Sequence, residues 1–339
     1  MRLSTGMLEK LLQEYLEAKK FSKKSVRAYQ DTFKLFSKYL IRINKDSDLR
    51  DFSRDDMKKF IDYLCRYKKK NGDYLKNESK RSFFFRVRCF IRYLYQMEYL
   101  LYNPVDGIEL KIKEDSLARR IMTVEEMEKF LSGIASSDAA TQARDKALFE
   151  TMYITGMRSS EIRSLKISDI DFDRDQILIR DGKGSKDRIV PIGTISKKYL
   201  YEYISKFRKK FLQGSKDNGF LFTSRRTKKK MNSNNLIRQF KRYAEIAGLN
   251  KDLTPHCIRH SASTHLLDGG AGIKYVKTFL GHKNIETTVT YTHFMIDSIK
   301  KLFRKYHPRE NGLYEEVPPD LETKVMEMMK HYQKKVSLY

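Results

Sequence analysis

The stretch TGMRSSE, residues 155–161, closes one predicted helix and opens another, with Arg158 at the junction. The helix before it covers about residues 138–153, where apolar side chains recur at helical spacing. Glu161 follows the arginine by three residues. Alone this segment is a weak signal, and its meaning depends on what surrounds it.

The period of the apolar residues changes just beyond this stretch. Residues 176–180 and 187–192 are short runs rich in β-branched side chains, and DGKGSK, residues 181–186, separates them. Such a pattern predicts a β-hairpin with a glycine-rich turn. Lys183 and Lys186 then lie at its tip.

Three further polar segments follow in order. TPHCIRH, residues 254–260, opens a helix with His256 and Arg259 three residues apart, hence on one face. LGHK, residues 280–283, and TYTH, residues 290–293, come next. Each segment is weak by itself, but the five in this order and spacing are highly specific.

Helical periodicity dominates the rest of the chain. The first third predicts a small four-helix domain, with helices over residues 7–19, 25–41, 54–69 and 76–99. Ser22 and Ser53 are the expected N-caps of the second and third helices, and Thr123 with Glu126 forms a capping box for a later one. Other helices are predicted at about residues 196–212, 232–247, 256–267, 273–280, 294–306 and 321–336.

Charge indicates the partner. The chain has 339 residues, enough for about two domains. Its 69 Lys and Arg against 43 Asp and Glu give a net charge of +26, which both halves share. This excess argues against an ordinary neutral metabolic enzyme and favours a nucleic-acid partner. The candidate DNA-binding residues are Arg81, Arg86, Arg88, Arg225, Arg226 and Lys228; a solvated basic surface is the alternative.

Several other classes of protein are not expected. No stretch is apolar enough for a membrane span, and the first residues lack the apolar core of a signal peptide. Cys65, Cys89 and Cys257 are odd in number and widely spaced, so we expect reduced thiols in a cytoplasmic protein.

No metal or other cofactor is expected either. The alternating acidic residues 169–175 invite a calcium-loop interpretation, but Arg174 stands where a calcium loop needs glycine and Arg180 where it needs a carboxylate. His256 and His260 could share a helix face as zinc ligands, but the charge of Arg259 opposes a cation there.

The five polar segments resemble the tyrosine recombinase/integrase family, particularly its Xer-like members, over nearly all of residues 5–305. The resemblance implies a mainly α fold: a helical core-binding domain and a mixed, mostly helical catalytic domain with a small β-hairpin or sheet, closing on DNA as a C-shaped clamp. The expected boundaries are a core-binding (SAM-like) domain at 1–110, a linker at 111–121, a catalytic domain at 122–310 and a C-terminal extension at 311–339. Cys257 and Ile258, within the His-x-x-Arg motif, and the long C-terminal extension depart from compact members.

The residues also suit the chemistry directly. Cutting a phosphodiester without a metal needs a nucleophile, cations for the nonbridging oxygens and a proton for the leaving oxygen. Arginine suits the second task because its guanidinium binds phosphate oxygens bidentately. The candidate catalytic residues are Arg158, Lys183 (with Lys186 as its competitor), His256, Arg259, His282 and the nucleophile Tyr291. By resemblance, Glu161 supports the Arg158 segment.

We therefore expect a bacterial site-specific recombinase that exchanges strands through a 3′-phosphotyrosyl intermediate without metal or ATP. Its expected partners are double-stranded recombination sites and three further protomers in a homotetramer, or a second recombinase, at the nucleoid. A type IB topoisomerase and a non-catalytic DNA-binding regulator are the alternatives. An apolar stripe over residues 294–303 suggests docking on a neighbouring protomer, with packing on its own domain as the alternative. The 321–336 helix could pack in cis, in trans or remain loose.

Overall fold

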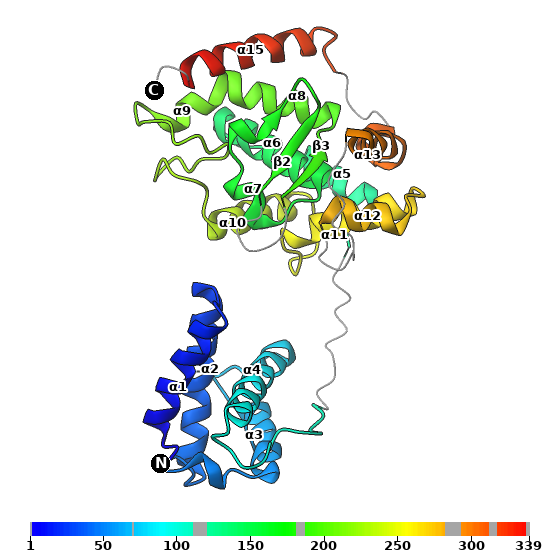
Figure 1. Cartoon of the computed structure of the whole chain (residues 1–339). Helices are drawn as coiled ribbons and strands as arrows, with labels where there is room; N and C mark the ends of the chain where they lie inside the picture. The colour runs from blue at the N-terminus through cyan, green and yellow to red at the C-terminus, as the bar shows by residue number, and fades with distance from the viewer. Residues whose placement is uncertain are drawn as a thin grey trace. The chain divides into compact units, whose positions relative to one another are not determined.

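The structure is a computed structural model that describes residues 2–69, 71–110, 121–180, 187–281, 293–311 and 317–336. The chain divides into two units, Met1–Leu117 and Ala118–Tyr339 (Figure 1), and each is described by itself. Both are mostly helical, and the second holds one small sheet, so the predicted fold class is confirmed. Apart from Ile121, the predicted linker at 111–121 lies outside the described residues.

The first unit consists of the four predicted helices: α1 (Thr5–Ala18), α2 (Lys23–Arg42), α3 (Arg54–Arg66) and α4 (Asn77–Gln96). The expected caps are present. The Ser22 hydroxyl accepts a hydrogen bond from the Ser25 N–H, and Ser53 forms a capping box with Asp56. The apolar faces meet in a core rich in aromatic side chains, including Phe36, Phe60 and Phe90.

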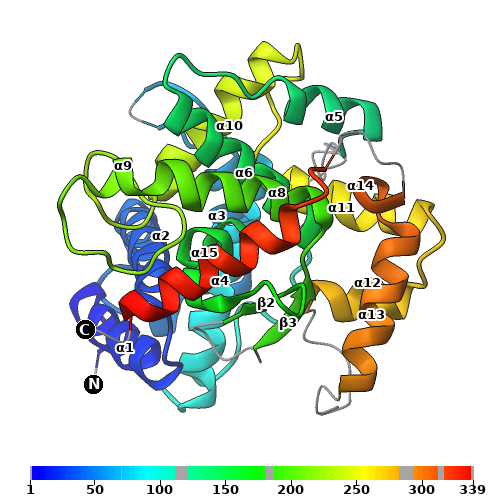
Figure 2. The same cartoon turned by 90° about the horizontal axis from the view of Figure 1, so that it is seen from above.

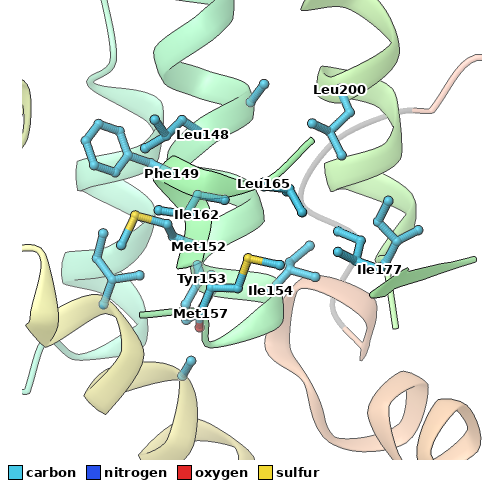
Figure 3. Close-up of a cluster of buried hydrophobic side chains, with 14 of the residues drawn as sticks. Leu148, Phe149, Met152, Tyr153, Ile154, Met157, Ile162, Leu165, Ile177 and Leu200 are labelled. Carbon is cyan, nitrogen blue, oxygen red and sulfur yellow. The ribbon is translucent and has the colours of Figure 1, made fainter. Parts of the chain in front are cut away.

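The second unit is built around α6 (Ala139–Thr155), which is buried on every face. A helix surrounded in this way belongs to the centre of a core. It contacts α5 (Val124–Ser132), α7 (Ser159–Ser164), α8 (Thr194–Glu202) and α11 (His256–Asp268). Figure 3 shows part of the resulting core, a cluster that joins side chains of α6 to Ile162 of α7, Leu200 of α8 and Ile177 of the sheet.

The hairpin is confirmed, and it carries a strand that the sequence did not predict. β1 (Ile170–Asp171), β2 (Gln176–Ile179) and β3 (Arg188–Pro191) form an antiparallel sheet in that order. Ile170 is buried and pairs with Ile177, so a tertiary contact decides this short strand. The turn at 181–186 lies outside the described residues.

The helix predicted over residues 196–212 is interrupted. Its parts are α8, a π-helical segment (Tyr203–Phe207) and α9 (Arg208–Leu212). Arg208 directly follows the π-helical segment and is fully buried, with its guanidinium on Asp217 at 2.5 and 2.6 Å. The capping box of Thr123 and Glu126 is confirmed at α5. The remaining helices before the C-terminal region are α10 (Ser233–Ile246) and α12 (Ile273–Leu280).

The C-terminal region packs on its own unit through α13 (His293–Tyr306), α14 (Pro308–Asn311) and α15 (Leu321–Val336). Ile299 and Phe303 of α13 are buried in the core. The predicted docking of this stripe on a neighbour is therefore wrong for these two side chains, because their own unit already covers them. α14, which was not predicted, places Arg309 against buried Glu150 of α6.

Helix α15 has the predicted bounds and lies against α8 in cis (Figure 2). Leu321, Val325 and Met328 are buried at helical spacing, whereas Met326 is 47% exposed. Buried Lys197 of α8 holds the contact, because its ammonium lies 2.7 Å from Glu322 and 2.5 Å from Asp175.

Within the described ranges, every helix is too short or too polar to cross a membrane.

The buried His307 predicts acid sensitivity. Burial lowers the pKa of His307 to about 3, and its Nδ1 accepts a hydrogen bond from the Arg309 N–H. Since the folded pKa lies below the unfolded value of about 6.5, stability is lost as the pH falls from 6.5 towards 3. Between pH 7 and 5.5, wild type should lose about 1 kcal/mol more free energy of unfolding than His307→Gln. Urea titrations at both pH values measure this, with half-buried His260→Gln as the control; equal losses would contradict the prediction.

The docking of α15 predicts a matched pair of variants. Leu321→Ala removes a buried side chain and should cost about 2 kcal/mol of local stability, or about 30-fold in hydrogen-exchange protection of α15. Exposed Met326→Ala should change protection by no more than about twofold. Equal protection in both variants would show that α15 is not held through this face.

Candidate active site

Glu161 is the carboxylate at the centre of the candidate site. Arg158 caps α7, and its backbone N–H and Nη1 each donate to Glu161 at 2.7 Å. Arg188, the first residue of β3, donates from Nη1 and Nη2 to the two carboxylate oxygens at 3.0 and 2.8 Å. Burial would raise the pKa of Glu161, but the ion pairs with both arginines outweigh it and lower the pKa to about 2. The carboxylate is therefore ionised at neutral pH.

A third arginine completes the cluster. Arg259 of α11 is 8% exposed and donates to the carbonyl oxygens of Gly156 at 2.6 Å and Leu280 at 2.7 Å. Burial, followed by repulsion from Arg158 and Arg188, lowers the pKa of Arg259 to about 10. It stays protonated at neutral pH. Two guanidinium groups thus bind one carboxylate and a third is close enough to interact with them, and the excess positive charge favours an anion.

Two helix ends make this arrangement possible. Gly156 ends α6 and Gly281 ends α12, both in the left-handed conformation. A Cβ on Gly156 would lie 2.9 Å from Leu280 Cδ2, so a larger residue would push the two ends apart. The last carbonyls of a helix lack partners within it, and Arg259 supplies donors to both ends.

His256 is exposed on the first turn of α11, three residues before Arg259. Between them, Cys257 and Ile258 are buried in the core. Burial raises the pKa of the Cys257 thiol to about 12, which keeps it neutral. These two departures from the common motif therefore serve packing.

The other predicted catalytic residues lie outside the described residues: Lys183 with its competitor Lys186, His282 and Tyr291. The structure brings together Arg158, Glu161 and Arg259, and it adds Arg188, which the sequence interpretation missed. A signal was present: Arg188 is in phase with Val190, an inward-facing residue of the same short strand.

The candidate DNA-binding arginines of α4 are half-buried and not fully exposed. Arg86 Nη1 donates to Thr32 Oγ1 of α2 at 2.9 Å, so this side chain also joins two helices. Arg81 and Arg88 are likewise half-buried, whereas Arg92 is exposed on the same helix.

The second basic run forms a surface loop. Arg225 and Arg226 are exposed, and Arg225 pairs with Asp138 at 3.0 Å. Lys228 Nζ donates to Gln213 Oε1 at 2.9 Å. This loop presents more accessible charge than the α4 arginines do.

The acidic run before the hairpin, residues 169–175, contributes hydrogen bonds to the fold. Asp169 accepts hydrogen bonds from Arg180 Nε at 2.8 Å and from the Lys166 N–H at 2.9 Å. In the part of the chain that the structure describes, no group of three His, Cys, Asp or Glu side chains is placed to hold a metal ion.

Comparison with known proteins shows the family of the chain. The model of the phage integrase family matches residues 120–296, and that of the phage integrase SAM-like domain matches residues 7–113. The tyrosine recombinase XerC of Pediococcus pentosaceus is 31% identical, over 88% of this chain and 97% of its own. The tyrosine recombinase XerD of Listeria innocua is 30% identical, over 89% of this chain and 99% of its own.

A solved structure shares the fold. The XerH site-specific recombinase in a post-cleavage complex with its palindromic difH substrate has a TM-score of 0.64 at 23% identity, covering 88% of this chain and 83% of that one. The family match and the two Xer relatives identify this chain as a member of the phage integrase family of tyrosine recombinases, a Xer-like site-specific DNA recombinase.

Proposed function

We propose that this recombinase cleaves and rejoins DNA through Tyr291 and that Arg158 and Arg259 hold the scissile phosphate. The observation that supports this proposal best is the proximity of two arginines: Arg158 is bound to Glu161, and Arg259 lies near enough for the charge of Arg158 to lower its pKa. A phosphodiester gains negative charge as a nucleophile attacks, and fixed guanidinium groups stabilise that charge.

The proposed steps balance without a metal. Tyr291 Oη attacks the phosphorus and passes its proton to a nearby histidine, His256 or His282, while Arg158 and Arg259 neutralise the nonbridging oxygens. The 5′ oxygen leaves with a proton from Lys183. A 3′-phosphotyrosyl link and a free 5′-hydroxyl result. A 5′-hydroxyl from another strand reverses the step, so the bond energy is kept and ATP is not needed.

The two parts of the chain have distinct proposed roles. Residues 1–110 form the core-binding domain and residues 122–310 the catalytic domain, joined by the linker 111–121 and closing on duplex DNA as a clamp. The exposed arginines of the 225–230 loop support phosphate contacts there, with Lys228, and with Arg81, Arg86 and Arg88 on α4. Residues 311–339 are an extension of the catalytic domain, which the cis packing of α15 supports.

The proposed assembly is a homotetramer on two paired sites in the bacterial cytoplasm, at the nucleoid, because reciprocal exchange needs four nucleophiles around two duplexes. A second recombinase could supply two of them. Both chromosome-dimer resolution and mobile-element integration or excision fit the chemistry.

A nicked duplex carrying the target site tests the activity. Wild type should form a covalent protein–DNA adduct on a denaturing gel and exchange strands with a second site. An adduct accompanied by relaxation of any supercoiled plasmid would instead indicate a topoisomerase. Absence of an adduct would indicate a DNA-binding regulator.

Tyr291→Phe should abolish the adduct while DNA affinity stays within about threefold, since phosphate contacts dominate affinity. The hydroxyl is needed for attack and contributes little to charge neutralisation. Adduct gels and gel-shift titrations measure the two effects, with Tyr306→Phe as a matched control on α13. An adduct formed by Tyr291→Phe would assign the nucleophile to another residue.

Excess EDTA should leave the rate of adduct formation unchanged. Charge stabilisation is assigned to arginines and histidines, and the positive cluster around Glu161 would repel a divalent cation. The measurement compares time courses with EDTA and with added magnesium. Loss of the adduct in EDTA and its return with magnesium would overturn the proposed mechanism.

A further inference from the structure

Arg188 and Arg158 share Glu161 but differ in exposure. The Arg188 side chain is 3% exposed, whereas that of Arg158 is 35% exposed. Of these two cations, Arg158 is therefore the one that a substrate phosphate can reach. Arg188 faces inward, where both of its Nη atoms lie on the carboxylate.

The buried carboxylate of Glu161 needs a cation close to it. Leaving a buried charge without its partner is strongly destabilising. Arg158 Nη1 already donates to one oxygen of Glu161 at 2.7 Å. Without Arg188, the unpaired charge of the carboxylate would bind a second nitrogen of the Arg158 guanidinium as well. Arg158 would then be withdrawn from the phosphate, although its own contacts with DNA had not been altered.

Arg188 also contacts the end of α12. Gly281 has φ +66, and a Cβ there would lie 2.7 Å from Arg188 Cδ. The aliphatic stem of Arg188 therefore packs against the backbone of the residue that directly precedes His282. In the sequence, Arg188 follows Lys183 of the hairpin turn by five residues.

We propose that Arg188 is a positioning residue for strand cleavage: it occupies Glu161 so that the Arg158 guanidinium stays available to the scissile phosphate. This inference rests on the proposed function, because it assumes that Arg158 binds that phosphate. Arg188 itself makes no contact with DNA in this account.

Single-turnover cleavage of a saturating nicked substrate tests the proposal. Arg188→Met keeps an unbranched apolar stem and removes the guanidinium charge, and it should slow adduct formation by about 100-fold, as small misplacements of a catalytic group do. DNA affinity should stay within about threefold. Arg188→Lys should recover part of the rate, because it restores the charge without the bidentate geometry.

The double variant Arg188→Met/Glu161→Gln separates positioning from simple support of the fold. Removing the carboxylate charge also removes the pull on Arg158, so the double variant should cleave at least about tenfold faster than Arg188→Met. It also avoids a buried unpaired charge and remains informative if the single variant does not fold. The proposal would be overturned by a folded double variant that is as slow as Arg188→Met. If the single variant cannot be measured, a folded double variant that stays about 100-fold below wild type would overturn it.

Arg180→Met is the matched control. Arg180 also pairs with a buried carboxylate beside the sheet, Asp169 at 2.8 Å, but its side chain is 62% exposed. Its cleavage rate should stay within about threefold of wild type. Failure of wild type to form the adduct would refute the proposed function. A normal adduct with an unimpaired Arg188→Met would refute the positioning role alone.

Discussion

The interaction on which the site depends is the burial of one carboxylate, Glu161, between two guanidinium groups. A buried carboxylate is tolerated only with close cations and hydrogen bonds. Arg158 and Arg188 supply them from a helix start and a strand start, and this ties α7 to β3. Because Arg259 adds a third positive charge nearby, the carboxylate stabilises the cluster without neutralising it. The cluster remains attractive to a phosphate.

Helix ends supply the rest of the geometry. The C-terminal ends of α6 and α12 meet at Arg259, which donates to a carbonyl of each. Gly156 and Gly281 allow this approach, since a Cβ at either position would collide with a neighbour. The helix ends therefore bring together segments more than 100 residues apart in the sequence.

The C-terminal region shows why an apolar pattern does not identify its partner. Ile299 and Phe303 of α13 recur at helical spacing, as predicted, but both are buried within their own unit, as is Leu321 of α15. Charged contacts hold this arrangement: Arg309 pairs with Glu150 and Lys197 with Glu322. Neither pair is visible in the local sequence, because the partners are far apart along the chain.

Local sequence alone determined most helices, the hairpin and the caps at Ser22, Ser53 and Thr123, because their hydrogen bonds join residues three or four positions apart. It also determined the family, through the spacing of Arg158, His256 and Arg259. Only the tertiary structure decided strand β1, the hydrogen bond of Arg86 to Thr32 and the ion pair of Arg188 with Glu161. The two residues of the Arg188–Glu161 contact are 27 positions apart in the sequence. Local sequence cannot identify such a pair, because the partner of a buried charge depends on which groups folding brings close to it.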